Sequence, residues 1–169
     1  MLSKMLKNFI TFFTLIFASN SITQAETKLG LETFKISPET VLELTSKSMT
    51  FDRQNGSAHF VDDVVVNYGK LTLSAQKLTF YQSQNKNELK YFTFSASGPI
   101  IISSENINIS GNTANFSEKK QLLKISGNVK LIQNSNLIIG DELILDLEKG
   151  IASITGSVKT IINPNGTIK

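Results

Sequence analysis

The stretch ISGNVKLIQNSNLIIGDELILDLEKGIASITG, residues 125–156, contains the pattern that decides the fold. In its first part apolar and polar residues alternate: Ile125, Val129 and Leu131 occupy odd-numbered positions, and polar residues occupy the even-numbered ones. Successive side chains of a β-strand point to opposite faces, so this alternation predicts a half-buried strand. We find no comparable helical periodicity after the first 25 residues, and the sequence therefore predicts an all-β domain.

A short pattern recurs along the chain, written as apolar-x-small-x-x-apolar-x-apolar. It reads LTSKSMTF at 44–51, LSAQKLTF at 73–80, ISGNTANF at 109–116 and IIGDELIL at 138–145. The starts are 29, 36 and 29 residues apart, which is typical of a stacked array. We predict four hairpin-like units, with a seven-residue insertion in the second, at about 41–66, 71–102, 107–131 and 136–162.

Each copy of this pattern changes parity in the middle. Leu44 and Ser46 share one parity, whereas Met49 and Phe51 share the other. Such a shift turns the apolar residues outward unless the strand bends or bulges. The pattern therefore predicts a corner after each small residue, where backbones approach closely. The corresponding small residues in the later units are Ala75, Gly111 and Gly140.

A second signature follows each copy, with a central residue between alternating apolar positions. The central residues are Asp62, Gly98, Gly127 and Gly156. Because Asp62 replaces a glycine and neighbouring strand residues point to opposite faces, we interpret Asp62 and Asp63 as a frayed first unit rather than a carboxylate pair.

Residues 1–25 have the features of a cleaved secretory signal peptide. Lys4 and Lys7 precede an apolar run at 9–18, and a small-residue site ends at Ala25. The run is about half of the roughly 20 residues that a membrane-spanning helix needs, although a membrane anchor is the alternative. Cleavage leaves one domain at 26–169.

The charge of the domain excludes few classes of partner, and it gives no indication of nucleic-acid binding. The whole chain has 17 basic and 14 acidic residues, and the signal contains two of the basic ones. The remaining net charge is +1. The lysines are scattered along the sequence and do not form the basic stripe with interleaved aromatic residues that a nucleic-acid interface needs.

Residue types that support catalysis or metal binding are scarce. The chain has no cysteine and one histidine, His59, which excludes disulfides and a two-histidine metal site. We interpret His59 as a solvated residue, and the acidic residues of GDELILD do not match an EF-hand loop. The sequence predicts no enzyme activity, no metal and no cofactor.

The inward parity defines a long apolar interior. Two interpretations remain open, a packed sandwich core and a slot for an apolar ligand. The predicted lining consists of Leu73, Leu78, Phe80, Phe94, Ile100, Ile102, Ile109, Phe116, Ile125, Val129, Leu131, Ile138, Leu143, Leu145 and Ile154.

The units, and 125–156 above all, resemble the OstA-like domain family of lipopolysaccharide-transport proteins. The resemblance covers about 35–160, and within the family it is nearest to the periplasmic bridge component. A G-N-V strand followed by x-G-D-x-L-x-L-D-L carries it. The matching positions have structural roles and are Gly127, Asn128, Val129, Gly140 and Asp141, with Gly98 and Gly156 in equivalent places. Asp62-Asp63 stands where the family has Gly-Asn, and little follows the fourth unit.

This resemblance implies an open antiparallel β-jellyroll, with two sheets in a V around an apolar groove. The groove would shield the acyl chains of lipid A in the periplasm of a Gram-negative bacterium, peripheral to both membranes. The implied partners are lipopolysaccharide and the like-folded domains of LptC and the LptD N-terminus.

Spacing adds an expectation about assembly. A fifth unit would begin at Thr167, so we expect an unfinished coil that exposes a strand edge. Exposed edges pair with other chains by β-augmentation, which predicts head-to-tail self-association.

Three alternatives stay open. The first is a membrane-anchored, LptC-like component of the same pathway, which would keep residues 1–25. The second is a secreted β-solenoid with a structural or adhesive role and a closed core. The third is a β-helix carbohydrate enzyme, although such enzymes cluster carboxylates on one strand face and this pattern is lacking in the sequence.

Overall fold

The computed structural model describes residues 40–82 and 91–163, and all regular structure there is β. The predicted signal peptide and most of the predicted insertion lie outside these residues. The strands are β1 (Leu42–Thr45), β2 (Ser48–Asp52), β3 (Ser57–Tyr68), β4 (Leu71–Gln82), β5 (Phe92–Ser103), β6 (Ile107–Ser117), β7 (Leu122–Gln133), β8 (Asn136–Asp146), β9 (Ile151–Thr155) and β10 (Lys159–Ile161).

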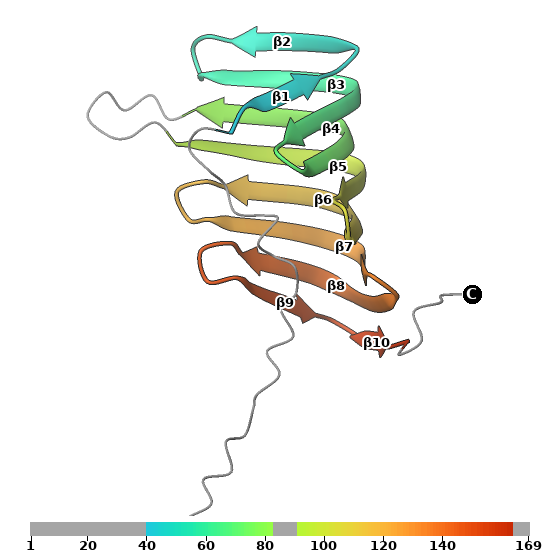
Figure 1. The fold of residues 1–169 in the computed structure, drawn as a ribbon. Coiled ribbons are helices and arrows are strands. Elements are labelled where there is room, and N and C mark those ends of the chain that lie inside the picture. Colours follow the sequence, from blue (N-terminus) through green and yellow to red (C-terminus); the bar gives the residue numbers. More distant parts are fainter. Residues whose placement is uncertain (1–39, 83–90, 164–169) are drawn as a thin grey trace, which may run out of the picture.

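The strands form one antiparallel sheet stacked almost in chain order (Figure 1). The order is β1-β3-β4-β5-β6-β7-β8-β10, while β2 also pairs with β3 and β9 also pairs with β8. Short β1 and β2 therefore act together as one strand beside β3, and β9 with β10 act as one beside β8. The prediction of an all-β, open antiparallel fold is confirmed.

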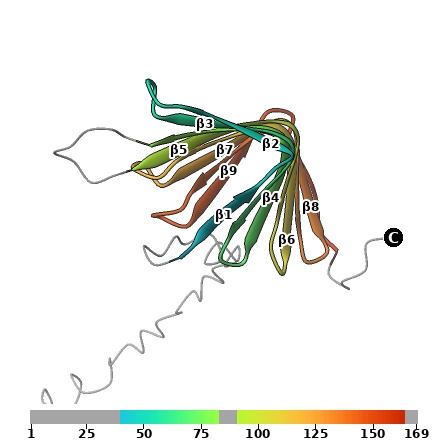
Figure 2. The ribbon, with the colours of Figure 1, turned by 90° about the horizontal axis from the view of Figure 1, so that it is seen from above.

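Every long strand bends, so the sheet has a V-shaped cross-section when it is seen from above (Figure 2). Because β3 to β8 run through the bend, the two sides are arms of one continuous sheet rather than separate sheets. Arm 1 consists of β2, β9 and residues 57–61, 77–82, 92–97, 113–117, 122–126 and 142–146. Arm 2 consists of β1, β10 and residues 64–74, 100–110 and 129–140.

A line of β-bulges produces the bend. Ser126 pairs with Glu142, and Val129 pairs with Gly140, so two residues of β7 lie opposite one residue of β8. An extra residue on one strand bends that strand and increases its twist. The register shifts in the same way between Val61 and Val64 of β3 and between Ser97 and Ile100 of β5.

Gly127 and Asn128 form the bulge of β7 because both residues tolerate left-handed backbone. Their φ angles are +84° and +51°, a region that glycine adopts freely and asparagine adopts more readily than most residues. A Cβ on Gly127 would also lie 2.7 Å from the side-chain nitrogen of Asn112 on β6. Glycine is therefore required here for its dihedral angle and for its size.

Asp62 and Asp63 form the same bulge in β3, with φ angles of +61° and +50°. The interpretation of these residues as a frayed first unit is wrong, since they keep the register shift that glycine-containing bulges make elsewhere. The Asp63 carboxylate also forms an ion pair with Lys47, whose Nζ lies 2.8 Å from it.

The corners predicted from parity are confirmed on the alternate strands. In β6, Ile109 and Gly111 are buried on one side of the bend, and Ala114 and Phe116 are buried on the other. The small residue is needed because the next strand crosses here: a Cβ on Gly111 would lie 2.5 Å from Cγ2 of Ile125. The same overlap would arise between Gly140 and Ile154.

Within 40–82 and 91–163, we find no helical segment with the length and apolarity needed to cross a bilayer. The apolar core lies between the inner faces of the two arms, and the outer faces are mostly polar.

Candidate functional site

The inner faces of the arms carry apolar rows that run along the stack. Cross-strand pairing aligns one row on arm 1, consisting of Phe80, Phe94, Phe116, Leu123 and Leu145. It aligns a second row on arm 2, consisting of Leu73, Ile102, Ile109, Leu131 and Ile138. The candidate site therefore consists of apolar rows that run the length of the stack, rather than of a few residues at one point.

All the lining residues predicted from the sequence lie in this apolar cluster between the arms. Most are buried, whereas Phe80, Phe94, Ile138 and Ile154 are partly exposed. Their contact with a ligand remains a prediction. Near the bend the cluster is a packed core, because Ile125, Val129 and Leu143 have no exposed surface.

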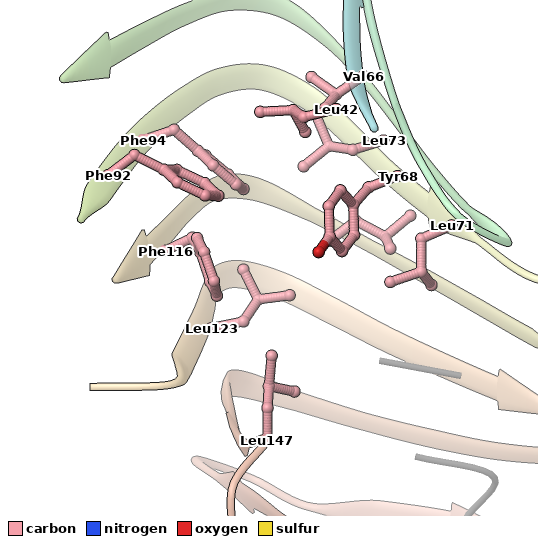
Figure 3. A pocket seen from close by; sticks show the side chains of 11 residues that line it. Leu42, Val66, Tyr68, Leu71, Leu73, Phe92, Phe94, Phe116, Leu123 and Leu147 are labelled. Carbon is pink, nitrogen blue, oxygen red and sulfur yellow. The ribbon is translucent and has the colours of Figure 1, made fainter. Parts of the chain in front are cut away.

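Toward the open edges of the V, the packing leaves a hollow of about 70 Å³. Its exposed lining is entirely apolar. In Figure 3, side chains of arm 1 such as Phe92, Phe116 and Leu123 face Leu71 and Tyr68 of arm 2. The complete lining is Leu42, Val66, Tyr68, Leu71, Leu73, Phe92, Phe94, Ile102, Phe116, Leu123 and Leu147.

Sequence reasoning identified Leu73, Phe94, Ile102 and Phe116 of this lining and left the others out. Four omitted residues, Leu71, Phe92, Leu123 and Leu147, continue the inward parity of residues that were named, so the same alternation could have found them. The remaining omitted residues are Leu42, Val66 and Tyr68. These lie on β1 and β3, from which no lining residue was predicted.

Phenylalanine rings make the wall of arm 1 aromatic. The ring centroids of Phe80 and Phe92 are 5.2 Å apart, and those of Phe94 and Phe116 are 5.4 Å apart. Phe92 also lies 5.5 Å from Phe116, which joins the four rings in one cluster. Aromatic side chains present large apolar surfaces, and the facing wall of arm 2 is mainly aliphatic.

Tyr68 brings a phenol to the lining of the hollow. Burial raises the pKa of its hydroxyl, and a side-chain hydrogen bond with Thr40 opposes that rise. The phenol is therefore neutral at physiological pH, and the lining contains no ionised side chain.

His59 does not belong to this hollow, because it lies on the outer face of arm 1. Its Nε2 is 3.2 Å from Ser57 Oγ, and its Nδ1 is 3.1 Å from Thr79 Oγ1. The interpretation of His59 as a solvated residue is wrong, since the ring is half-buried between two hydroxyls. Ser57 is only 2% exposed, so the pair does not present an accessible nucleophile.

The other motif residues have structural positions at the bend. Gly98 and Gly127 belong to the bulged strands β5 and β7, Gly156 lies between β9 and β10, and Gly140 is the small corner residue of β8. A Cβ on Gly156 would overlap the Asp141 side chain, which lies over it. None of these residues, nor Asn128, lines the apolar hollow.

With this geometry in place, comparison with known proteins identifies the family. A model of the LptA/(LptD N-terminal domain) LPS transport protein family matches residues 43–151. The chain belongs to this family. Its members are lipopolysaccharide-transport proteins rather than enzymes. Membership confirms the resemblance and the prediction that the chain is not an enzyme.

The LptA-like β-jellyroll is also found among solved structures. The chain is similar to the crystal structure of LptH, the LptA-homologous periplasmic component of the lipopolysaccharide transport device of Pseudomonas aeruginosa. The TM-score is 0.65 at 19% sequence identity, with 75% of this chain and 97% of LptH covered. No curated protein sequence matches the chain.

Proposed function

We propose that this chain is a periplasmic carrier that shields the acyl chains of lipopolysaccharide between its two arms. The observation that supports it best is the all-apolar hollow, which continues into apolar rows along the whole stack. Moving a methylene group from water into such an environment stabilises binding by about 0.8 kcal/mol. Transport of this kind needs a continuous apolar lining and no catalytic group.

The arms must separate for an acyl chain to enter. The hollow of about 70 Å³ is smaller than the apolar cavity of about 150 Å³ that holds one benzene molecule. Within the described residues, strands pair only with neighbours in the stack, so no backbone pairing joins the inner faces of the arms. Side-chain packing alone closes the V, and the line of bulges is its hinge.

Spin labelling tests this site, because the chain contains no cysteine. A label attached to Phe94→Cys reports on the hollow, and one on Ser153→Cys reports on the exposed outer face of arm 1. We expect lipopolysaccharide to immobilise the label at position 94 and to leave the label at position 153 unchanged. Equal responses at both positions, or none at 94, would contradict the proposal.

The ends of the stack supply the proposed contacts with other chains. Among the described strands β2 pairs only with β3, and its Met49 and Phe51 are 58% and 62% exposed although they continue the inner rows. At the other end, β9 and β10 pair only with β8 among the described strands. A second copy would cover these edges and bury both side chains, which supports head-to-tail assembly.

The repeat supports one particular register for that contact. Leu123 of β7 pairs with Leu145 of β8, and Ala152 and Phe51 hold the equivalent places in the last and first strands. The next copy would therefore place Phe51 opposite Ala152 and Met49 opposite Ile154. This register continues the apolar rows from one copy into the next.

Disulfide trapping tests the register. In this arrangement Thr50 of one copy lies directly opposite Ser153 of the next, so Thr50→Cys with Ser153→Cys should give covalent ladders on oxidation. Ser48→Cys with Ser153→Cys is the matched control, two positions out of register, and should give far fewer. Equal yields would contradict the register, and a lack of any oligomer would contradict end-to-end assembly.

The same edges would receive the like-folded domains of LptC and the LptD N-terminus, and the carrier would thus bridge inner and outer membrane complexes. This role requires removal of residues 1–25. Mass spectrometry of the mature N-terminus separates it from the anchored, LptC-like alternative, in which Met1 to Ala25 would be retained.

A further inference from the structure

The outer face of arm 1 carries a compact array of hydroxyl and amide side chains on β4, β5 and β6. Cross-strand pairing places three side chains in each of three rows. The rows are Lys77, Ser97 and Thr113, then Thr79, Ser95 and Asn115, then Tyr81, Thr93 and Ser117.

This array is unusual for a solvent-exposed sheet because Lys77 is its only charged member. A charged fraction of about 25–35% is a design target for the surface of a soluble protein. The same face regains charge on neighbouring strands, where Lys124 Nζ lies 2.7 Å from Glu142 Oε2. Short hydroxyl side chains lose little rotamer entropy when they are ordered, so the array is suited to forming hydrogen bonds with a ligand.

The array is also hollowed. One shallow hollow of about 310 Å³ is lined by Lys77, Thr79, Ser95, Ser97, Thr113 and Asn115, with Leu78 and Ala96. A second of about 640 Å³ shares Ser97 and Thr113 and continues over the bend to Asn112, Asn128 and Lys130. Both hollows are open to solvent, and together they form a shallow furrow on the outer side of the sheet.

Neighbouring side chains hold the furrow in place. Thr79 is bonded to the His59 ring at 3.1 Å, and the Ser95 hydroxyl donates to Asn115 Oδ1. Asn115 can still donate through its amide NH₂ group. Tyr81 lies at the end of the array, outside the lining of both hollows; it pairs with Thr93, and 44% of its surface is exposed.

An exposed aromatic ring beside hydroxyls and amides matches the chemistry of a sugar chain, whose rings present both C–H faces and hydroxyl groups. The side-chain amides of Asn112, Asn115 and Asn128 each pair a donor with an acceptor, which complements an acetamido group. We propose that this furrow binds an N-acetylated amino-sugar chain. The site is separate from the apolar hollow, because it lies on the opposite face of the sheet.

Titration of ¹⁵N-labelled mature protein with chitotetraose, followed by NMR, tests the proposal. We expect shift changes to concentrate on the outward residues of β4, β5 and β6. Tyr81→Ala and Asn115→Ala should each weaken binding at least fivefold, whereas Ser153→Ala and Thr155→Ala, on the same face of β9, should have no effect. Cellotetraose, which lacks the acetamido groups, should bind at least fivefold more weakly than chitotetraose.

Three results would overturn the proposal. They are an absence of shift changes with chitotetraose at millimolar concentration, changes spread evenly over the molecule, and equal binding of cellotetraose. The lipid response is a separate readout: lipopolysaccharide should still immobilise a label at position 94 in the Tyr81→Ala protein. Loss of both responses in that variant would overturn the assignment of Tyr81 to a separate site.

Discussion

At the scale of single residues, the bend depends on side chains that fit over glycines. Asn112 lies over Gly127, and Asp141 lies over Gly156, while both glycines hold left-handed backbone. Each of these two glycines therefore meets two steric requirements, a left-handed backbone and space for the side chain that lies over it. Neither glycine contacts the apolar hollow, so we assign both to shape rather than to binding.

Gly127→Ala should destabilise the fold strongly, because a Cβ adds overlap with Asn112 to an unfavourable φ angle. We expect a loss of about 2–4 kcal/mol in the free energy of unfolding, measured by urea denaturation. Gly150→Ala is the matched control, since its φ is +67° but a Cβ there would meet nothing within 4 Å. It should cost only about 1 kcal/mol, and equal costs would contradict the steric account.

Asp146 gives the fold a pH dependence. A side-chain hydrogen bond with Lys149, together with that residue's backbone N–H, lowers the pKa of the Asp146 carboxyl below its ordinary value of 3.8. A lowered folded-state pKa stabilises the fold above the unfolded pKa, and this stabilisation is lost as pH falls through the folded pKa.

Thermal unfolding between pH 7 and pH 2 should therefore show Asp146→Asn less stable than the unaltered protein at neutral pH. The difference in Tm should shrink as pH falls below about 4. A difference that stays constant with pH would mean that the carboxylate charge contributes nothing to the turn.

At the scale of strands, alternation and parity predicted the half-buried strands and the corner of each unit. The bulge at Asp62-Asp63 could not be predicted in the same way, because aspartate in isolation does not signal a left-handed backbone. Residues at strand ends, such as Leu42 and Tyr68, also escaped prediction, since the distance between arms decides whether they line the hollow. The hydrogen bond of His59 with Thr79 depends on the register of β3 with β4, and the sequence of one strand does not determine that register.

Replacing Asp62-Asp63 by Gly-Asn should stabilise β3, because it copies the bulge of β7 and removes an unfavourable φ angle at position 62. The lost ion pair with Lys47 is exposed and weak. Left-handed backbone costs a residue other than glycine about 1–2 kcal/mol, and the greater unfolded-state freedom of glycine offsets about 0.5–1 kcal/mol of this, so we expect a net gain of about 0.5–1 kcal/mol in the free energy of unfolding, measured by urea denaturation. A net loss would show that the acidic pair has a stabilising role that the later bulges lack.

At the scale of the whole molecule, the V is closed by side-chain packing and joined only at its bend. Lipid entry should therefore widen the angle between the arms. Spin labels at Asn108 and Ser117, on the two ends of β6, should move apart by several ångströms when lipopolysaccharide binds, as measured by double electron–electron resonance. Labels at Asn108 and Lys159, both on arm 2, should keep their separation, and an unchanged β6 distance would contradict hinge opening.

The central claim is that acyl chains lie between the inner faces of the arms. Site-specific photocrosslinking in living cells tests it most directly, with probes at Phe94 and Phe116 in the hollow and at Asn108 and Ser153 on the outer faces. We predict lipopolysaccharide adducts from the two inner positions and none from the two outer ones. Adducts of equal yield from all four positions, or none from the inner pair, would contradict the account.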